Sequence, residues 1–211
     1  MIFLAFEGLD GSGKSSLMKQ LEQHLESFQI AYIKTREPGG TPIGDRLREI
    51  ILEKSITPPT ARTELLLYQA CRAQHVDQVI RPALNNKKWV LCDRFSASSI
   101  AFQAGGRKIS KDEVVWLNHF ATENLKPHLQ ILLDLTVEES KKRRQNRVTE
   151  VGVDEDRIES EAAEFHQRVR NGFLEQSREN PKDWLVLNAA QSPEKLFKEL
   201  LFELQGRQWL V

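Results

Sequence analysis

The sequence predicts an α/β fold in which a five-stranded parallel sheet has helices on both faces. Short β-branched or aromatic runs alternate with longer stretches of helical periodicity, which is typical of repeated strand-helix-strand units. The first run leads directly into a glycine-rich turn and a helical pattern. No repeat or low-complexity linker divides the 211 residues. We therefore expect a single domain over residues 1–211, with a mobile lid at about residues 143–157.

The expected strands are short runs rich in Val, Ile, Leu and aromatic residues. They are Ile2–Phe6, Ile30–Lys34, Trp89–Cys92, Gln130–Leu135 and Trp184–Leu187. The expected helices are Gly13–Phe28, Ile43–Glu53, Thr63–Asn85, Ser96–Gln103, Lys111–Asn124, Val137–Arg147, Ile158–Glu179 and Pro193–Gln205. Right-handed crossovers between such strands make the sheet parallel and place a ligand crevice at the carboxyl ends of the strands.

Composition favours a compact intracellular enzyme that binds small phosphorylated ligands. The 30 basic and 30 acidic side chains cancel, so there is no net field to hold a nucleic acid polymer or an anionic membrane. No apolar run approaches the length of a membrane span, and the apolar N-terminus lacks a basic leader. Cys71 and Cys92 have no metal-ligand spacing and are expected to be buried thiols in a reducing compartment.

The most specific motif is a G-x-x-x-x-G-K-S loop between the first expected strand and the first expected helix. It consists of Gly8, Leu9, Asp10, Gly11, Ser12, Gly13, Lys14 and Ser15. The glycines let backbone N–H groups point at phosphate oxygens, Lys14 adds a positive charge, and Ser15 offers a hydroxyl to Mg²⁺. The following helix adds its positive dipole end. The loop predicts a P-loop NTPase-like, three-layer α/β/α protein that handles a nucleoside triphosphate.

An acidic residue, Asp93, and a basic residue, Arg94, follow the third expected strand. Asp93 lies on the same rim as the loop around Lys14 and can hold Mg²⁺ directly or through water. Arg94 is then a fork-shaped donor to a phosphate. A surface salt bridge is a common alternative for this dipeptide alone, but the neighbouring phosphate loop favours the metal and phosphate roles.

The segment Thr35–Thr41 follows the second expected strand and therefore lies on the same rim of the sheet. Pro38 and two glycines predict a tight turn there. Arg36, together with Arg48 in the next helix, could grip a second phosphate. Taken alone, the segment would more often be a plain strand-to-helix turn.

Tyr68 and Arg72 are four residues apart and share one face of an expected helix. An aromatic ring and a guanidinium placed in this way can stack on a base and bond its edge. A core aromatic beside a surface arginine is the commoner arrangement of such a pair.

The segment from Arg144 to Asp156 is charged, contains Gly152 and has no strand signal, which is typical of a mobile flap. Basic residues lie just before and within its first turn, namely Lys141, Lys142, Arg143, Arg144 and Arg147. A solvated basic face would explain such a run. Beside a triphosphate site, an arginine from the run could instead contact the transferring phosphoryl group.

Four ordered motifs resemble those of the thymidylate kinases, especially the bacterial type, over nearly the whole chain. They are Phe6–Ser15, Thr35–Thr41, Asp93–Phe95 with Ser98–Gln103, and Asp156–Glu159. The resemblance implies transfer of the γ-phosphoryl group of ATP to dTMP with Mg²⁺, which gives dTDP and ADP for dTTP synthesis. It also implies a cytoplasmic homodimer with small-molecule substrates and no nucleic acid polymer or membrane as partner.

The resemblance implies roles for individual residues as well. Asp10 matches the carboxylate near the sugar 3′-hydroxyl, Tyr68 the ring that stacks on thymine, and Arg72 the donor to the base carbonyl. Arg94 and Arg48 resemble ligands of the acceptor phosphate. The expected substrate site is completed by Arg36, Pro38, the base-pocket residues Ser99 and Gln103, and Phe102, whose ring crowds the 2′ position.

Members of this family carry the catalytic arginine either in the phosphate loop or in the lid. The loop here has Gly11 and Ser12 and no arginine, so the chain is similar to the lid type. Arg143 and Arg147 match the lid positions, and we favour Arg147 as the residue that reaches the phosphates. The expected catalytic set is Lys14, Asp93, Arg94, Arg143 and Arg147, and Asn188–Ala190 is expected to touch adenine.

Three features depart from the family pattern. Tyr68 stands where phenylalanine is more frequent, and Phe95 and Phe102 stand where tyrosines are frequent. Val148–Glu155 is longer than the usual flap, which leaves the choice among the lid arginines open. Two alternatives remain, another nucleotide kinase of the same fold and a switch-type GTPase, although the Asn-Lys-x-Asp motif of the latter is absent.

Overall fold

A parallel sheet organises the computed structural model, which describes residues 1–152 and 154–210. Its strands are β1 (Phe3–Glu7), β2 (Tyr32–Arg36), β3 (Trp89–Asp93), β4 (Leu129–Asp134) and β5 (Trp184–Asn188). The five strands lie in the order β2-β3-β1-β4-β5, and every neighbouring pair is parallel. The predicted α/β class with a five-stranded parallel sheet is confirmed, and each strand lies within two residues of its expected bounds.

Helices connect the strands and cover the sheet. They are α1 (Lys14–Ser27), α2 (Pro42–Leu52), α3 (Ala61–His75), α4 (Arg81–Asn85), α5 (Ser96–Ser99), α6 (Lys111–Thr122), α7 (Val137–Val151), α8 (Ala163–Glu179) and α9 (Pro193–Gly206). Wider π-helical turns, η1 (Val76–Ile80) and η2 (Ile100–Gly106), continue α3 and α5, and a short 3₁₀ turn, η3 (Pro181–Asp183), precedes β5. None of these helices is long and apolar enough to cross a membrane.

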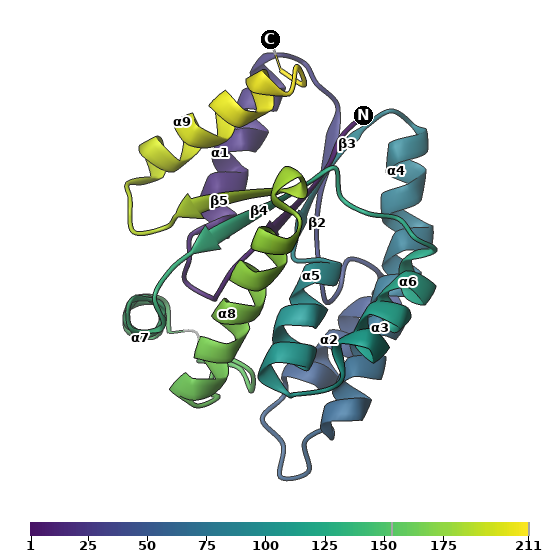
Figure 1. Cartoon of the computed structure of the whole chain (residues 1–211), viewed down its shortest axis with the longest axis vertical. Helices are drawn as coiled ribbons and strands as arrows, with labels where there is room; N and C mark the ends of the chain where they lie inside the picture. Colours follow the sequence, from purple (N-terminus) through teal and green to yellow (C-terminus); the bar gives the residue numbers. More distant parts are fainter. Residues whose placement is uncertain (153, 211) are drawn as a thin grey trace.

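Side-chain alternation along the central strand divides the core into two layers. Leu4 and Phe6 of β1 face one side, where they pack with apolar residues of α1 and α9. Phe3 and Ala5 face the other side and pack with Val76 and other residues of η1 and α4. A strand that is apolar on both faces is the signature of a sheet covered on both sides. Figure 1 shows α1 and α9 together on one face of the sheet.

The helix before the expected lid is longer than the sequence predicted. α7 begins after Thr136, whose hydroxyl accepts the Glu139 N–H at 3.2 Å, and it extends past Arg147 to Val151. Gly152 ends it in the left-handed conformation, with φ of 70°. The first part of the expected lid is therefore helical, and α8 begins at Ala163 rather than Ile158. Val153 lies outside the described residues, and the mobility of the lid stays a prediction.

The sheet topology brings the predicted motifs to one edge. β1 lies between β3 and β4, so the chain leaves the carboxyl end of β1 at the point where the strand order changes direction. The phosphate loop follows β1, the Thr35–Thr41 turn follows β2, and Arg94 follows β3. Ligands of open α/β sheets bind in the crevice at such a switch point.

Candidate functional site

The glycine-rich loop folds around Lys14 at the carboxyl end of β1. The buried Lys14 Nζ donates to the carbonyl oxygens of Gly8 at 3.4 Å and Leu9 at 3.2 Å. Burial lowers the pKa of Lys14, and so does the charge of Arg94. Gly8 has φ of 133°, and a Cβ there would lie 2.5 Å from the Leu133 carbonyl oxygen. The loop thus presents a helix N-terminus and an ammonium group at one point.

Asp93 and Ser15 line a common depression beside this loop. Asp93 Oδ1 is buried and has no hydrogen-bond partner within the described part of the chain. No group of three metal-ligating side chains gathers among residues 1–152 and 154–210. Mg²⁺ at phosphate-transfer sites takes one or two protein oxygens and fills its remaining positions with phosphates and water. A carboxylate oxygen and a hydroxyl in this position fit that pattern.

Arg94 connects the loop to a second cavity. Its backbone is left-handed, with φ of 69°, and its N–H donates to the Phe6 carbonyl at 2.9 Å. The guanidinium donates to Asp10 Oδ1 at 2.7 Å and to the Gly8 carbonyl at 2.9 Å, and it lies 5.0 Å from the centre of the Phe102 ring. Burial alone would raise the pKa of Asp10, but the charges of Arg94 and Lys14 hold it well below its usual range.

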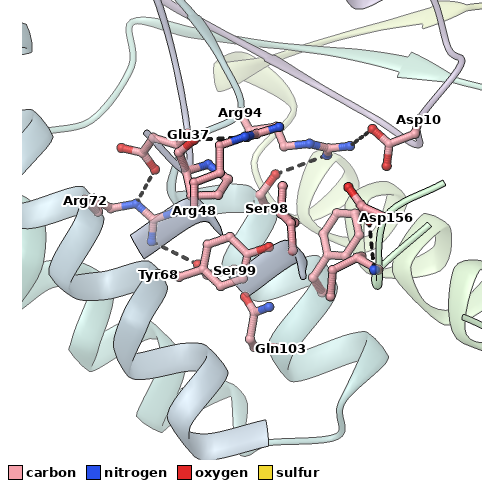
Figure 2. Close-up of a pocket in the computed structure, with 14 residues that line it drawn as sticks. Asp10, Glu37, Arg48, Tyr68, Arg72, Arg94, Ser98, Ser99, Gln103 and Asp156 are labelled. Carbon is pink, nitrogen blue, oxygen red and sulfur yellow. Dashed lines mark hydrogen bonds and ion pairs between the residues drawn. The ribbon is translucent and has the colours of Figure 1, made fainter. Parts of the chain in front are cut away.

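The second cavity collects most of the predicted substrate residues (Figure 2). Its lining comprises Asp10, Glu37, Pro38, Arg48, Leu52, Tyr68, Arg72, Arg94, Ser98, Ser99, Phe102, Gln103, Asp156 and Ile158. These residues come from the phosphate loop, the turn after β2, α2, α3, the segment after β3, and the segment before α8. We call this cavity the acceptor pocket.

Arg72 is the best-anchored side chain of the acceptor pocket. It is 1% exposed, and its guanidinium donates to Glu37 at 2.8 Å, Ser99 at 2.9 Å, Asn118 at 2.7 Å and the Phe95 carbonyl at 3.0 Å. Because all of these partners accept hydrogen bonds from one planar guanidinium, the orientation of the Arg72 side chain is fixed before any ligand binds. Figure 2 shows Tyr68 beside it. Burial raises the pKa of Tyr68, so its hydroxyl stays neutral.

The two arginines that were paired in the sequence interpretation lie in different cavities. Arg48 lines the acceptor pocket, and its Nη1 donates to the Pro38 carbonyl at 3.0 Å. Arg36 pairs with Asp45 at 3.2 Å with over half of its side chain exposed, and it lines the depression that contains Asp93. The structure therefore does not bring Arg36 together with Arg48.

Arg143 is a lid arginine that hydrogen-bonds to the phosphate loop. Its Nη1 donates to the Gly11 carbonyl at 3.4 Å and its Nη2 to the Ala189 carbonyl at 3.0 Å. It thereby joins α7 to the phosphate loop and to the predicted adenine segment.

The other two lid arginines pair with acids that follow α7. Arg144 is buried, and it donates to Ser140 at 2.7 Å and Glu155 at 3.0 Å. Arg147 Nη2 donates to both carboxylate oxygens of Glu159 at 2.8 Å, while its Nε is buried and has no partner within the described part of the chain. Arg147 therefore has both a competing acid and an unused donor.

Sequence reasoning assigned no site role to three carboxylates, namely Glu7, the Arg72 partner Glu37, and Asp156. Glu7 is buried at the end of β1 and accepts from the Phe95 N–H at 2.9 Å and the Ser98 hydroxyl at 2.6 Å. Burial raises its pKa from 4.5 to about 7. Asp156 lines the acceptor pocket and was noted only as part of a motif. An acid at the end of an otherwise apolar strand was the signal available for Glu7.

Comparisons with known proteins agree with this geometry. Residues 6–200 match the family described as thymidylate kinase. The chain is 60% identical over 210 residues to the thymidylate kinase of Bdellovibrio bacteriovorus, with 100% of this chain and 98% of the relative covered. It is 44% identical to that of Ligilactobacillus salivarius, with 94% and 95% covered. It is 42% identical to that of Geotalea uraniireducens, with 92% and 91% covered.

Proposed function

The chain belongs to the thymidylate kinase family, and we propose from this premise that its phosphate loop holds ATP while its acceptor pocket holds dTMP. The reaction is transfer of the γ-phosphoryl group of ATP to dTMP, which gives dTDP and ADP in the synthesis of dTTP. The position of Arg94 carries this proposal, since its guanidinium contacts the loop at Gly8 and lies against Phe102 of the pocket. The two phosphate-binding regions thus share one cation.

On the donor side, the loop amides and Lys14 hold the β- and γ-phosphates. Lys14 Nζ exchanges its carbonyl partners for phosphate oxygens, which are stronger acceptors because they are charged. Mg²⁺ would be held by Ser15 and Asp93 and would neutralise charge on the donor phosphates. Asn188–Ala190 would contact adenine, close to where Arg143 reaches the Ala189 carbonyl.

On the acceptor side, Arg94 and Arg48 hold the dTMP phosphate in line with the γ-phosphate. Tyr68 stacks on thymine, Arg72 donates to a base carbonyl, and Phe102 crowds the 2′ position. The substrate residues Asp10, Pro38, Ser99 and Gln103 complete the pocket around the sugar and base. The attacking phosphate oxygen is already ionised, so the reaction requires no general base.

Lid closure completes the site. We propose that Arg147 leaves Glu159 and contacts the transferring phosphoryl group while water is expelled. Arg143 stays on the phosphate loop and keeps α7 in place.

The assembly we propose is a homodimer in the cytoplasm. Apolar side chains more than half exposed lie on the neighbouring helices α2, α3 and α6, namely Ile43, Ile50, Leu66, Trp116 and Phe120. The last two rings stack with centroids 6.0 Å apart. Exposed apolar patches of this kind mark protein interfaces. Phe120→Asp should halve the mass measured by light scattering, and an unchanged dimer would refute this interface.

Two buried free cysteines support the cytoplasmic location, because they suit a reducing compartment.

The test of the function is coupled ADP release with ATP, Mg²⁺ and a panel of dTMP, dUMP, UMP, CMP and GMP. We expect the highest kcat/KM with dTMP. Faster turnover of another monophosphate would establish a different nucleotide kinase. Slow nucleotide hydrolysis that does not respond to any acceptor would establish a switch-type NTPase.

A further inference from the structure

A fully buried carboxylate behind the acceptor pocket has no role in the function proposed so far. Glu64 of α3 is 0% exposed. It accepts from Gln103 Nε2 at 3.0 Å, from Arg107 Nε and Nη2 at 3.0 to 3.2 Å, and from Arg157 Nη2 at 2.8 Å. One carboxylate thus gathers donors from η2 and from the segments that follow η2 and precede α8.

The surroundings of Glu64 keep it ionised. Burial alone would raise the pKa of its carboxyl, but hydrogen bonds and charge from Arg107, with the bonds from Gln103 and Arg157, lower it instead. An ionised carboxylate can only accept hydrogen bonds. Only the NH₂ end of the Gln103 amide can satisfy it, so chemistry settles which end of the amide faces Glu64.

The oxygen of the Gln103 amide therefore faces the acceptor pocket. Gln103 is 1% exposed and lines the acceptor pocket together with Arg72 and Ser99. Figure 2 shows its amide oxygen on the side of Tyr68. The base end of the pocket then offers a hydrogen-bond acceptor from Gln103 and a donor from Arg72. This pair complements an imide edge, in which a ring N–H adjoins a carbonyl, as in thymine and uracil. It opposes cytosine, whose ring nitrogen at that position is an acceptor.

We propose that Glu64 is a positioning residue for base selection, which holds the amide nitrogen of Gln103 and so fixes the amide oxygen as an acceptor for a base N–H. This inference rests on the proposed function and adds the residue that sets the hydrogen-bonding pattern of its pocket. Glu64 acts through Gln103 and does not touch the nucleotide.

Glu64→Gln tests the proposal because a glutamine can either donate or accept. The Gln103 amide can then turn over and present its NH₂ group to the pocket. We expect the ratio of kcat/KM for dTMP to kcat/KM for dCMP to fall about ten- to a hundredfold, the range expected when a buried hydrogen-bonding group is mismatched. The change should fall mainly on the two KM values, with kcat at saturating dTMP little altered.

Three further variants separate positioning from general damage. Glu64→Asp keeps an acceptor-only group and should keep the ratio even if activity falls. Arg107→Met removes one arm of the network, leaves the bond between Glu64 and Gln103 intact, and should also keep the ratio. The double variant Glu64→Gln/Arg107→Met removes one negative and one positive charge and so restores charge balance in the cluster. If Glu64→Gln alone does not fold, the ratio is measured in this double variant instead.

The proposal would be overturned if the ratio of kcat/KM for dTMP to kcat/KM for dCMP were the same in Arg107→Met and in the double variant. If the wild-type enzyme phosphorylates dTMP and these two ratios are equal, only the positioning role of Glu64 is refuted and the proposed function stands. A wild-type enzyme that leaves dTMP unphosphorylated would refute the proposed function, and this inference with it.

Discussion

The two halves of the site differ in what their polar side chains contact. In the base half, Arg72 is fixed by buried partners that would remain in place when a ligand binds, such as Glu37 and Asn118. In the phosphate half, the cations instead contact oxygens that bound phosphates would replace in the proposed reaction. Lys14 donates to loop carbonyls and Arg147 to Glu159. The comparison indicates that the base half is preorganised, whereas in the proposed reaction the phosphate half exchanges internal partners for phosphates.

This difference suits a transferase that must exclude water. Cations that become available only when phosphates replace their internal partners complete the catalytic arrangement after both substrates are bound. A rigid base pocket, in contrast, spends little of its binding energy on ordering side chains. The comparison predicts that substitutions in the phosphate half act on kcat and substitutions in the base half on KM.

The largest expected effect is that of Arg147→Ala. Loss of an arginine that contacts the transferring phosphoryl group should lower kcat by about 10³-fold and leave the KM for dTMP nearly unchanged. Steady-state kinetics at saturating ATP measure both values. Arg143→Ala is the matched control from the same helix and should cost less. An unchanged kcat in Arg147→Ala would reject this assignment, and a larger loss in Arg143→Ala would move the role to Arg143.

Glu7 joins the two halves, since it extends from β1 to the Phe95 N–H and the Ser98 hydroxyl. Burial raises its pKa from 4.5 to about 7. The folded state therefore holds this proton more tightly than the unfolded state does. Its stabilising contribution is complete below pH 4.5 and is lost as the pH rises through about 7. Glu7→Gln does not titrate, so its unfolding free energy relative to wild type should rise by about 2 to 3 kcal/mol between about pH 5 and pH 8.

Urea denaturation at both pH values measures this difference. The variant Glu53→Gln, at an exposed position after α2, is the control and should follow wild type at each pH. A difference between Glu7→Gln and wild type that does not change with pH would show that the buried carboxyl does not titrate in this range.

The base half should respond through binding. Tyr68→Ala removes the ring that is expected to stack on thymine and should raise the KM for dTMP about tenfold, because a base–aromatic stack contributes about 1 to 3 kcal/mol. Tyr68→Phe keeps the ring and should leave the KM close to wild type. If Tyr68→Ala binds dTMP normally, the ring is a core residue only.

The smallest effect is expected from Glu159→Gln. Glu159 accepts both hydrogen bonds of Arg147 Nη2, so loss of its charge should release the arginine and raise kcat about two- to fivefold, in line with the modest free energy of a partly exposed ion pair. Rapid-quench kinetics with dTMP would detect this. A loss of activity comparable to that of Arg147→Ala would show that Glu159 positions the arginine rather than competing for it.

The sequence predicted the sheet and the phosphate loop because both depend on local patterns. A continuous apolar run such as Phe3–Glu7 next to a glycine-rich loop determines a buried strand and a turn without help from distant residues. The end of α7 was misplaced because that helix is dominated by charged residues and has no apolar stripe, so its last turns resembled a loop.

The pairings within the site could not be predicted in the same way. Glu64 meets Gln103 across 39 positions of sequence, and the contact depends on how α3 and η2 both pack against α6. Arg36 and Arg48 lie close in sequence yet face different cavities, because Arg36 ends β2 and Arg48 belongs to α2. Such contacts are set by tertiary packing, which a residue pattern does not encode locally.

The most direct test of the account is chromatographic identification of the products formed from ATP, Mg²⁺ and dTMP by the purified protein. We predict one dTDP for each ADP, and no ADP above background when dTMP is omitted. ADP formed without dTDP, or dTMP recovered unchanged, would contradict the claim that the phosphate loop and the acceptor pocket act together on these two nucleotides.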